Sequence, residues 1–259
     1  MDKLDSKLRE LIITFRKLRD PVSGCPWDKE QDFKSIASCA IEESYEVADA
    51  IEREDFEDLK AELGDLLFQI VFHSEMAKEK DLFALEDVID ELNSKLIRRH
   101  PHVFGDGSVK DAKDSLKIWE DIKAKERSDK NLDSVMDDVP KNLPSLTRTK
   151  KLQKRASRVG FDWNNSKEIL EKVDEEINEL KHEDTKLNKE GIAEEIGDIF
   201  FTLIRLSGYH DLEPEDIIRK TNLKFENRFR KMENEAKSME TSLDKMNLEE
   251  LEKLWQKIK

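Results

Sequence analysis

The chain has 259 residues, of which 41% are charged, and its formal net charge is −14. This acidity argues against general nucleic-acid binding, which needs a basic surface, and two cysteines support neither a disulfide framework nor a zinc site. Plentiful Glu, Lys and Leu with only 8 Gly and 6 Pro predict an all-α protein. We expect a cytoplasmic protein with no membrane contact, because its apolar runs are too short to cross a bilayer.

The first half of the chain is predicted to hold five helices. Apolar residues recur at helical spacing over residues 4–18, 28–53, 56–78, 84–99 and 111–127. A turn-rich stretch at residues 22–27 separates the first two segments, and Glu54 and Asp55 form a short acidic turn between the second and third. The second and third segments are therefore expected to form a helical hairpin.

A polar stretch at residues 128–144 contains two prolines and is predicted to be a linker. Five further helices are predicted after it, at residues 145–158, 167–183, 189–208, 214–238 and 247–258. We therefore expect two tandem helical domains, at residues 1–127 and 145–259.

The first hairpin recurs in the second half of the chain. Six of its positions are repeated at one constant offset: Glu42, Glu43, Glu46, Glu62, Gly64 and Asp65 correspond to Glu175, Glu176, Glu179, Glu195, Gly197 and Asp198. Outside the hairpin the offset changes, since it is longer between Trp27 and Trp163 and shorter between Lys95 and Lys224. The pattern indicates a duplicated helical unit whose loops have changed in length.

The recurring acidic residues are predicted to converge within each hairpin. Glu43 and Glu46 lie about one turn apart, as do Glu62 and Asp65 on the next helix, so the hairpin can bring the two pairs together. In both copies this next helix is apolar on nearly all sides, so we expect it to be buried. Carboxylates this close raise one another's pKa unless a cation is present, and oxygen ligands select Mg²⁺ or Mn²⁺. A solvated acidic helix face is the alternative for one copy alone, and the recurrence of the pattern favours the metal site.

Short motifs outside the acidic pairs add to this pattern: Gly24-Cys25-Pro26-Trp27-Asp28, Arg98-Arg99-His100-Pro101-His102-Val103-Phe104 and Val159-Gly160-Phe161-Asp162-Trp163. With the doubled acidic pattern, they make nearly the whole chain resemble the MazG family of nucleoside triphosphate pyrophosphohydrolases. The resemblance implies hydrolysis of ribo- and deoxyribonucleoside triphosphates to a monophosphate and pyrophosphate, with Mg²⁺ held by an acidic tetrad. It also implies homodimerisation, which agrees with our expectation that a second copy completes four-helix-bundle-type domains.

Roles for individual residues follow from the pattern and the resemblance. Metal ligation is predicted for Glu43, Glu46, Glu62 and Asp65, and for Glu176, Glu179, Glu195 and Asp198. Glu42 and Glu175, at the edge of each cluster, are the candidates to orient or deprotonate the attacking water. Phosphate binding is predicted for Arg98, Arg99, Lys123, Lys172, Lys224 and Arg228, each of which has an ordinary exposed helix charge as its alternative. The resemblance places a base-stacking aromatic at Trp255, for which simple packing of the last helix is the alternative.

Three classes of function stay open at this point. The leading one is an enzyme that clears canonical or damaged nucleoside triphosphates from the nucleotide pool. The second is a regulatory nucleotide-binding module in which one or both acidic sites do not catalyse. The third is a helical interaction protein whose acidic faces dock a basic partner, and it alone predicts that Mg²⁺ leaves the stability of the fold unchanged.

Overall fold

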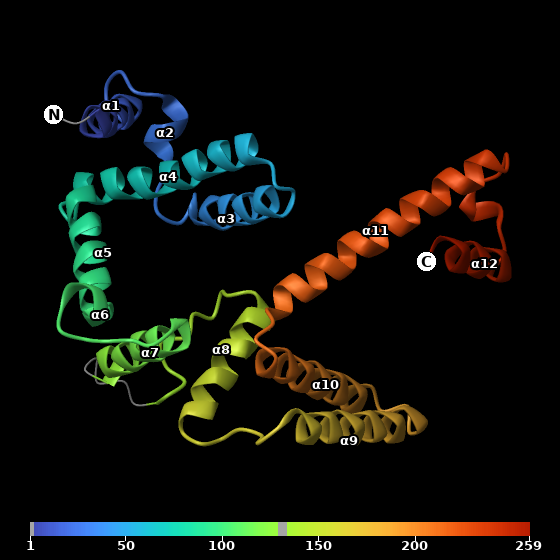
Figure 1. The fold of residues 1–259 in the computed structure, drawn as a ribbon. Coiled ribbons are helices and arrows are strands. Elements are labelled where there is room, and N and C mark those ends of the chain that lie inside the picture. The colour runs from blue at the N-terminus through green and yellow to red at the C-terminus, as the bar shows by residue number, and fades with distance from the viewer. Residues whose placement is uncertain (1–2, 129–133) are drawn as a thin grey trace. The chain divides into compact units, whose positions relative to one another are not determined.

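The computed structural model describes residues 3–128 and 134–259, which are helical with no strand, so the predicted all-α fold is confirmed. The chain divides into two compact units, Met1–Glu126 and Arg127–Lys259. The first contains α1 (Lys3–Leu18), α2 (Pro26–Glu30), α3 (Ala37–Glu52), α4 (Phe56–Glu79), α5 (Leu85–Arg99), α6 (Pro101–Phe104) and most of α7 (Ala112–Ser128) (Figure 1). The second contains α8 (Ser145–Arg158), α9 (Ser166–Thr185), α10 (Lys189–Tyr209), α11 (Pro214–Ser238), a 3-10 helix (Leu243–Lys245) and α12 (Leu248–Ile258). Residues 129–133 of the predicted linker lie outside the described residues.

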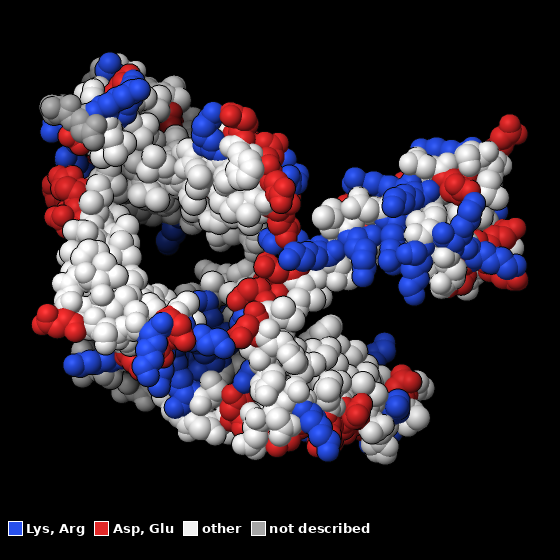
Figure 2. Space-filling view, viewed as in Figure 1, with Lys and Arg blue, Asp and Glu red and all other residues white. Residues whose placement is uncertain are grey.

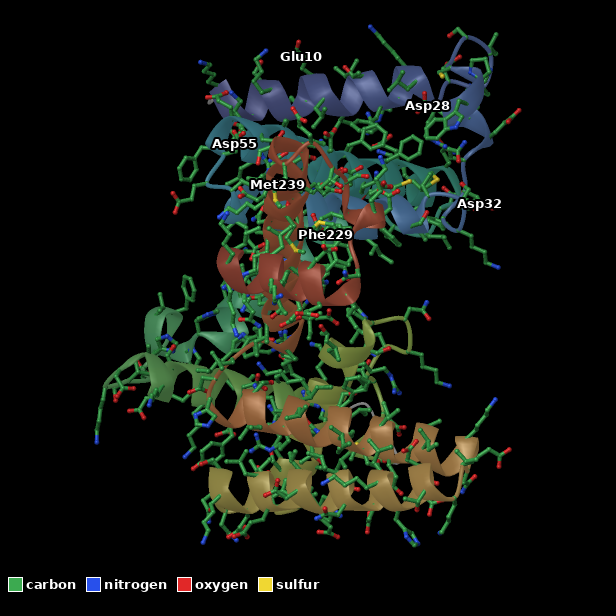
Figure 3. The ribbon with its side chains drawn as sticks, turned by 90° about the vertical axis from the view of Figure 1, so that its right-hand side faces the viewer. Glu10, Asp28, Asp32, Asp55, Phe229 and Met239 are labelled. Carbon is green, nitrogen blue, oxygen red and sulfur yellow. The ribbon has the colours of Figure 1, made fainter. Side chains whose placement is uncertain are left out.

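The prediction of one continuous helix over residues 28–53 is wrong, because the chain turns between α2 and α3. The Asp32 carboxylate accepts hydrogen bonds from the backbone N–H groups of Lys34 (2.8 Å) and Ser35 (2.9 Å). The Asp32 N–H in turn donates to the Ser35 hydroxyl at 2.9 Å. These local bonds replace helical pairing at residues 32–35, where Asp32 is labelled in Figure 3. Ile36 follows the turn and is buried in the core.

The two hairpins, α3–α4 and α9–α10, end and restart at equivalent positions. α3 ends at Glu52 and α9 at Thr185, and α4 and α10 begin at Phe56 and Lys189, so the boundaries keep the constant offset of the acidic residues. Each turn contains one non-glycine residue with a left-handed backbone, Glu54 and Leu187, both with φ of 55°. The sequence repeat therefore extends to the backbone geometry of the turn.

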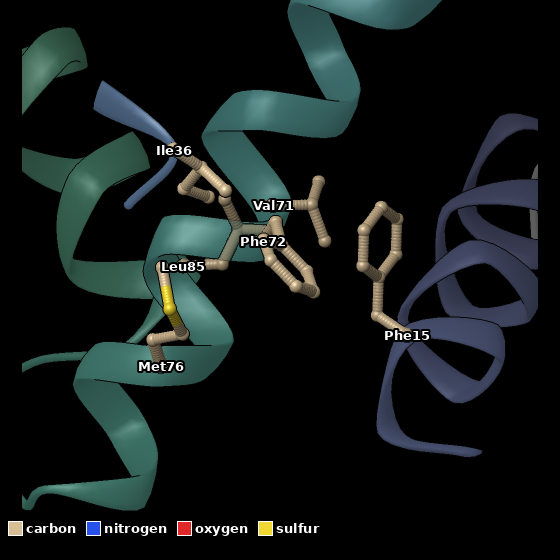
Figure 4. Packing of buried hydrophobic residues seen from close by; sticks show 6 residues of the cluster. All are labelled: Phe15, Ile36, Val71, Phe72, Met76 and Leu85. Carbon is tan, nitrogen blue, oxygen red and sulfur yellow. The ribbon is translucent and has the colours of Figure 1, made fainter. Parts of the chain in front are cut away.

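The core of the first unit lies around the C-terminal half of α4. Its buried members come from α1, the turn before α3, α4 and the start of α5, and they are Phe15, Ile36, Val71, Phe72, Met76 and Leu85 (Figure 4). The Phe15 ring centroid lies 5.0 Å from that of Phe68 and 6.0 Å from that of Phe72. This packing anchors α4 and leaves its N-terminal half, with Glu62 and Asp65, beside α3.

In the second unit, side-chain hydrogen bonds from α8 connect this helix to α10 and to the segment before α8. Gln153 of α8 donates its side-chain N–H to the carbonyl of Phe201 on α10 at 2.7 Å. Arg155 donates to the carbonyls of Val135 and Asp137, each at 3.0 Å. The part of the predicted linker that the structure describes, residues 134–144, is therefore fastened to α8.

Both hairpins keep an apolar face open to solvent within one chain. On α4, Leu63, Leu67 and Ile70 are 41–50% exposed, and on α10 Ile196, Phe200, Phe201 and Leu203 are 39–59% exposed. The expectation that these helices are buried all round therefore holds only for residues 71–77 of α4, where every side chain is buried or half-buried. Among the residues described, none of the helices is long and apolar enough to cross a membrane.

Candidate metal and nucleotide site

Three predicted metal ligands of the first unit converge at the α3–α4 contact. Glu43 of α3 and Glu62 and Asp65 of α4 each offer a carboxylate oxygen, and these three atoms lie within 4.8 Å of one another. Glu46 joins the group, because its negative charge lies close enough to raise the pKa of both Glu43 and Glu62. The structure thus brings all four predicted residues together.

The electrostatics of this first cluster favour a cation. Burial raises the pKa of Glu43 most, and the negative charges of Asp65 and Glu46 raise it further. Burial also raises the pKa of Glu62, followed by the charge of Glu46. Oxygen-only ligands at this spacing suit a hard divalent ion, which would relieve the repulsion among the carboxylates.

The second unit repeats the arrangement at the α9–α10 contact. Oxygen atoms of Glu176, Glu179 and Glu195 lie within 4.8 Å of one another, and Asp198 adds its negative charge beside Glu195. Burial raises the pKa of Glu179 and of Glu195, and the neighbouring carboxylates raise both further. Glu176 is buried, with 4% of its surface exposed, so its charge needs a partner.

Lys172 supplies that partner in the second unit. Its Nζ lies 2.8 Å from a carboxylate oxygen of Glu176 and 3.0 Å from one of Glu175. Hydrogen bonds to these two carboxylates, Glu176 first, hold the pKa of Lys172 above its usual value. The residue that corresponds to Lys172 in the first hairpin is Cys39, so the first cluster has no lysine at the equivalent place. The two clusters therefore differ in charge although their acidic residues match.

The two candidates for handling water lie at the edges of the clusters. Glu42 is exposed and lines an open groove along α3 with Tyr45, Glu46 and Asp49. Glu175 lines an open groove with Glu179 and with Glu195 of α10, and it is also engaged by Lys172.

The predicted phosphate-binding residues of the first unit lie outside its α3–α4 hairpin and contact residues other than the carboxylate cluster. Arg98 and Arg99, at the end of α5, both pair with Glu126 of α7, and Lys123 lies over the ring of Trp119. The contacts described for Arg98 and Arg99 do not include the carboxylate cluster of their unit.

In the second unit, Lys172 lies inside the acidic cluster, and the other predicted nucleotide-binding residues come from α11 and α12. Arg228 lies over the Trp255 ring, 5.6 Å from its centroid, and Phe225 packs against the same ring at 5.7 Å. Lys224 is exposed one turn before Arg228, and Figure 2 shows Lys and Arg side chains gathered along α11. Half-buried Trp255 thus both packs on a neighbour and keeps part of its surface open.

Sequence reasoning did not predict that Trp119 and Glu126 contact the basic residues at the end of α5. A signal for Trp119 was present, because Trp119, Ile122 and Lys123 recur as Trp255, Ile258 and Lys259. These pairs share the longer offset of Trp27 and Trp163. No comparable repeat marks Glu126, whose partners appear only when α5 and α7 are placed together.

Comparisons with known proteins bear on both units. Residues 31–104 match the family described as "MazG nucleotide pyrophosphohydrolase domain", and residues 143–225 match the family "Phosphoribosyl-ATP pyrophosphohydrolase". A "Nucleoside triphosphate pyrophosphohydrolase" of Escherichia coli (strain K12) is 43% identical over 256 residues, which cover 98% of this chain and 97% of that protein. A "Nucleoside triphosphate pyrophosphohydrolase/pyrophosphatase MazG" of Thermotoga maritima is 42% identical over 250 residues, 96% of this chain and 94% of that protein. A crystal structure of a mazG-related protein from Thermotoga maritima aligns with 46% of this chain and 98% of its own, at 27% identity and a TM-score of 0.38.

Proposed function

Because this chain belongs to the MazG family of nucleoside triphosphate pyrophosphohydrolases, we propose that it hydrolyses ribo- and deoxyribonucleoside triphosphates to a monophosphate and pyrophosphate, using Mg²⁺. The observation that carries the proposal is the acidic cluster between two hairpin helices, present in both units. Its proposed role is to remove canonical or damaged nucleotides from the nucleotide pool.

The proposed metal ligands are Glu43, Glu46, Glu62 and Asp65 in the first unit and Glu176, Glu179, Glu195 and Asp198 in the second. Carboxylate oxygens alone suit Mg²⁺, with Mn²⁺ as a substitute, and the raised pKa values of these clusters support a cation there. When bound, the metal supplies positive charge that offsets the negative charge of the triphosphate.

The residues of the chain have separate tasks in the proposed reaction. A water oxygen attacks the α-phosphorus, and the bond from that phosphorus to the oxygen bridging to the β-phosphorus breaks. The bond's electron pair leaves with pyrophosphate. Glu42 or Glu175, at the edge of its cluster, orients the water and accepts its proton. Arg98, Arg99 and Lys123 in one unit, and Lys172, Lys224 and Arg228 in the other, bind the phosphates, while Trp255 stacks on the base.

We also propose that two copies of the chain assemble into a homodimer. The exposed apolar faces of α4 and α10 support this, because contiguous apolar surface on a soluble helix usually marks an interface. A hairpin with an apolar face on one side needs further helices to complete a four-helix bundle. We assign residues 128–144 to the connection between the domains at 1–127 and 145–259.

The alternative function is a regulatory module in which one acidic cluster binds a nucleotide or metal without catalysis. The difference in charge between the clusters favours this for one unit, because Lys172 lies inside the carboxylates of the second and Cys39 takes its place in the first. One unit can therefore be catalytic while the other only binds, and the activity of variants in each cluster distinguishes the two roles.

The experiment measures pyrophosphate and monophosphate release from a panel of ribo- and deoxyribonucleoside triphosphates with Mg²⁺. Glu46→Gln and Glu179→Gln each remove one cluster charge, and the variant that abolishes release identifies the working unit. Glu57→Gln, 88% exposed at its side chain on α4, and Glu171→Gln, 63% exposed on α9, serve as matched controls and should keep full activity. Absence of cleavage with every divalent metal would reject the enzymatic proposal.

A further inference from the structure

The first unit contains an aromatic and cationic arrangement outside the acidic cluster. The Arg99 guanidinium lies 5.5 Å from the centroid of the Trp119 ring, and Lys123 Nζ lies 4.5 Å from it. Trp119 is only half-buried, so part of its indole surface is open to solvent. An indole bordered by cations can bind a planar base and its phosphates together.

The same arrangement is built in the second unit from equivalent parts. Arg228 at 5.6 Å from the Trp255 centroid corresponds to Arg99 over Trp119. The two arginines share the shorter offset seen for Lys95 and Lys224, and the two tryptophans share the longer offset of Trp27 and Trp163. The duplication has therefore kept an arginine over a tryptophan in both units although the intervening loops changed in length.

One carboxylate distinguishes the first arrangement from the second. Glu126 pairs with Arg98 Nε at 2.7 Å and with Arg99 Nη2 at 2.5 Å, and its own side chain is only 19% exposed. Hydrogen bonds from Arg99, and then from Arg98, hold the pKa of Glu126 down to about 2. Over the residues that the structure describes, Arg228 has no carboxylate partner. A guanidinium binds carboxylates and phosphates with the same N–H donors, so a carboxylate held by two guanidiniums occupies donors that can also bind a phosphate.

We propose that Arg98, Arg99 and Trp119 form a nucleotide subsite of the first unit, in which Glu126 occupies the place of a phosphate until a nucleotide displaces it. The base stacks on Trp119 in place of the Lys123 ammonium, which lies 4.5 Å from the ring centroid without nucleotide. The proposal rests on the proposed function only in treating Arg98 and Arg99 as phosphate ligands. It adds a base platform and an internal competitor, so that this subsite binds nucleotide more weakly than its arginines alone would.

The test is calorimetric binding of ATP and of inorganic tripolyphosphate to the full chain in EDTA, which prevents turnover. An Arg228→Gln background weakens the equivalent subsite of the second unit. In that background Glu126→Gln should bind both ligands about tenfold more tightly. Adding Trp119→Leu should weaken the binding of ATP, which loses the stacking of its base, and should leave the binding of tripolyphosphate unchanged. Asp121→Asn, an exposed carboxylate of the same helix, is the matched control and should change neither affinity.

Unchanged affinities for ATP and tripolyphosphate in a folded Glu126→Gln variant would overturn the proposal. Glu126 would then have only a structural role, linking α7 to α5 through its ion pairs. ATP and tripolyphosphate binding equally, with Trp119→Leu silent, would reject the base platform. If Glu126→Gln loses helical circular dichroism, Trp119→Leu alone still decides, since the ratio of ATP to tripolyphosphate affinity must fall. Pyrophosphate release by the wild-type chain with Mg²⁺ tests the proposed function separately, because these binding measurements require no turnover.

Discussion

Replacing Lys172 by methionine removes the cation inside the second acidic cluster and keeps the length of the side chain. Lys172 Nζ lies 2.8 Å from Glu176 and 3.0 Å from Glu175, and Glu176 is buried. Without the lysine, no cation among the described residues faces the buried Glu176 carboxylate beside Glu179 and Glu195 when metal is absent. The metal-free second unit should therefore be less stable.

The magnitude follows from the geometry of the pairs. Opposite charges about 3 Å apart attract by about 5 kcal/mol at an effective dielectric constant of roughly 20. The Lys172 side chain is 34% exposed, so water screens the pairs, and desolvation opposes them further. We expect a net loss of about 1–2 kcal/mol in the free energy of unfolding, or roughly 3–8 °C in Tm for a unit of this size.

Thermal unfolding in EDTA and in Mg²⁺ measures the effect. A bound Mg²⁺ replaces the missing positive charge, so Mg²⁺ should raise the Tm of Lys172→Met by more than it raises that of the wild type. Lys167→Met is the matched control, because Lys167 pairs with exposed Glu171 of the same helix, at 3.5 Å, and should change stability by less than about 0.5 kcal/mol. An equal gain from Mg²⁺ in Lys172→Met and in the wild type would refute the reasoning.

Two further predictions concern pH and packing. Four cluster glutamates have pKa values raised in the fold, so their contribution to stability is full below the ordinary value of 4.5 and is lost as the pH rises through the folded values: Glu43, Glu62, Glu179 and Glu195. Lowering the pH from about 8 to about 5 in EDTA should therefore raise their contribution to Tm. This contribution is measured as the difference in Tm between the wild type and a Glu62→Gln/Glu195→Gln variant. A difference in Tm that does not change with pH would contradict the prediction. Phe72→Ala, in the core of the first unit, should cost about 3–5 kcal/mol in urea unfolding, while Phe56→Ala, at 75% exposure, should cost less than about 0.5 kcal/mol. Equal costs for the two substitutions would show that the core is wrongly assigned.

Much of the acidic site could be predicted from the sequence because it depends on local spacing. Glu43 and Glu46 share a helix face, as do Glu62 and Asp65. Because only a short turn connects the two helices, they are expected to pack against each other as a hairpin. The repeat of the hairpin at a constant offset gave the prediction a second, independent instance. Helix periodicity likewise predicted the boundaries of α5 and of α7 to α12 closely, whereas the short helix α6 was not predicted, because Pro101 stands at its start, where proline is tolerated.

The features that sequence reasoning missed depend on side-chain contacts and burial that residue spacing does not show. The turn at Asp32 was hidden because apolar residues continue through it at helical spacing, whereas hydrogen bonds of the Asp32 and Ser35 side chains decide the backbone. Lys172 was predicted to bind phosphate, and its pairing with Glu176 inside the cluster follows only from the burial of Glu176 in the fold. Glu126 is distant in sequence from Arg99, so only the packing of α7 on α5 reveals its two partners.

The matched turns at Glu54 and Leu187 have a consequence for how the duplicated chain could diverge. Inserting one residue between the two acidic pairs would rotate the following pair by about 100° around its helix and carry it away from its partners. The stretch from Glu43 to Asp65 is therefore closed to insertions, and its copy has the same length, while the segments before and after it have changed in length. A glutamate in one copy and a leucine in the other share the same left-handed backbone. Divergence was free to replace the side chain of the turn, but not to alter its length.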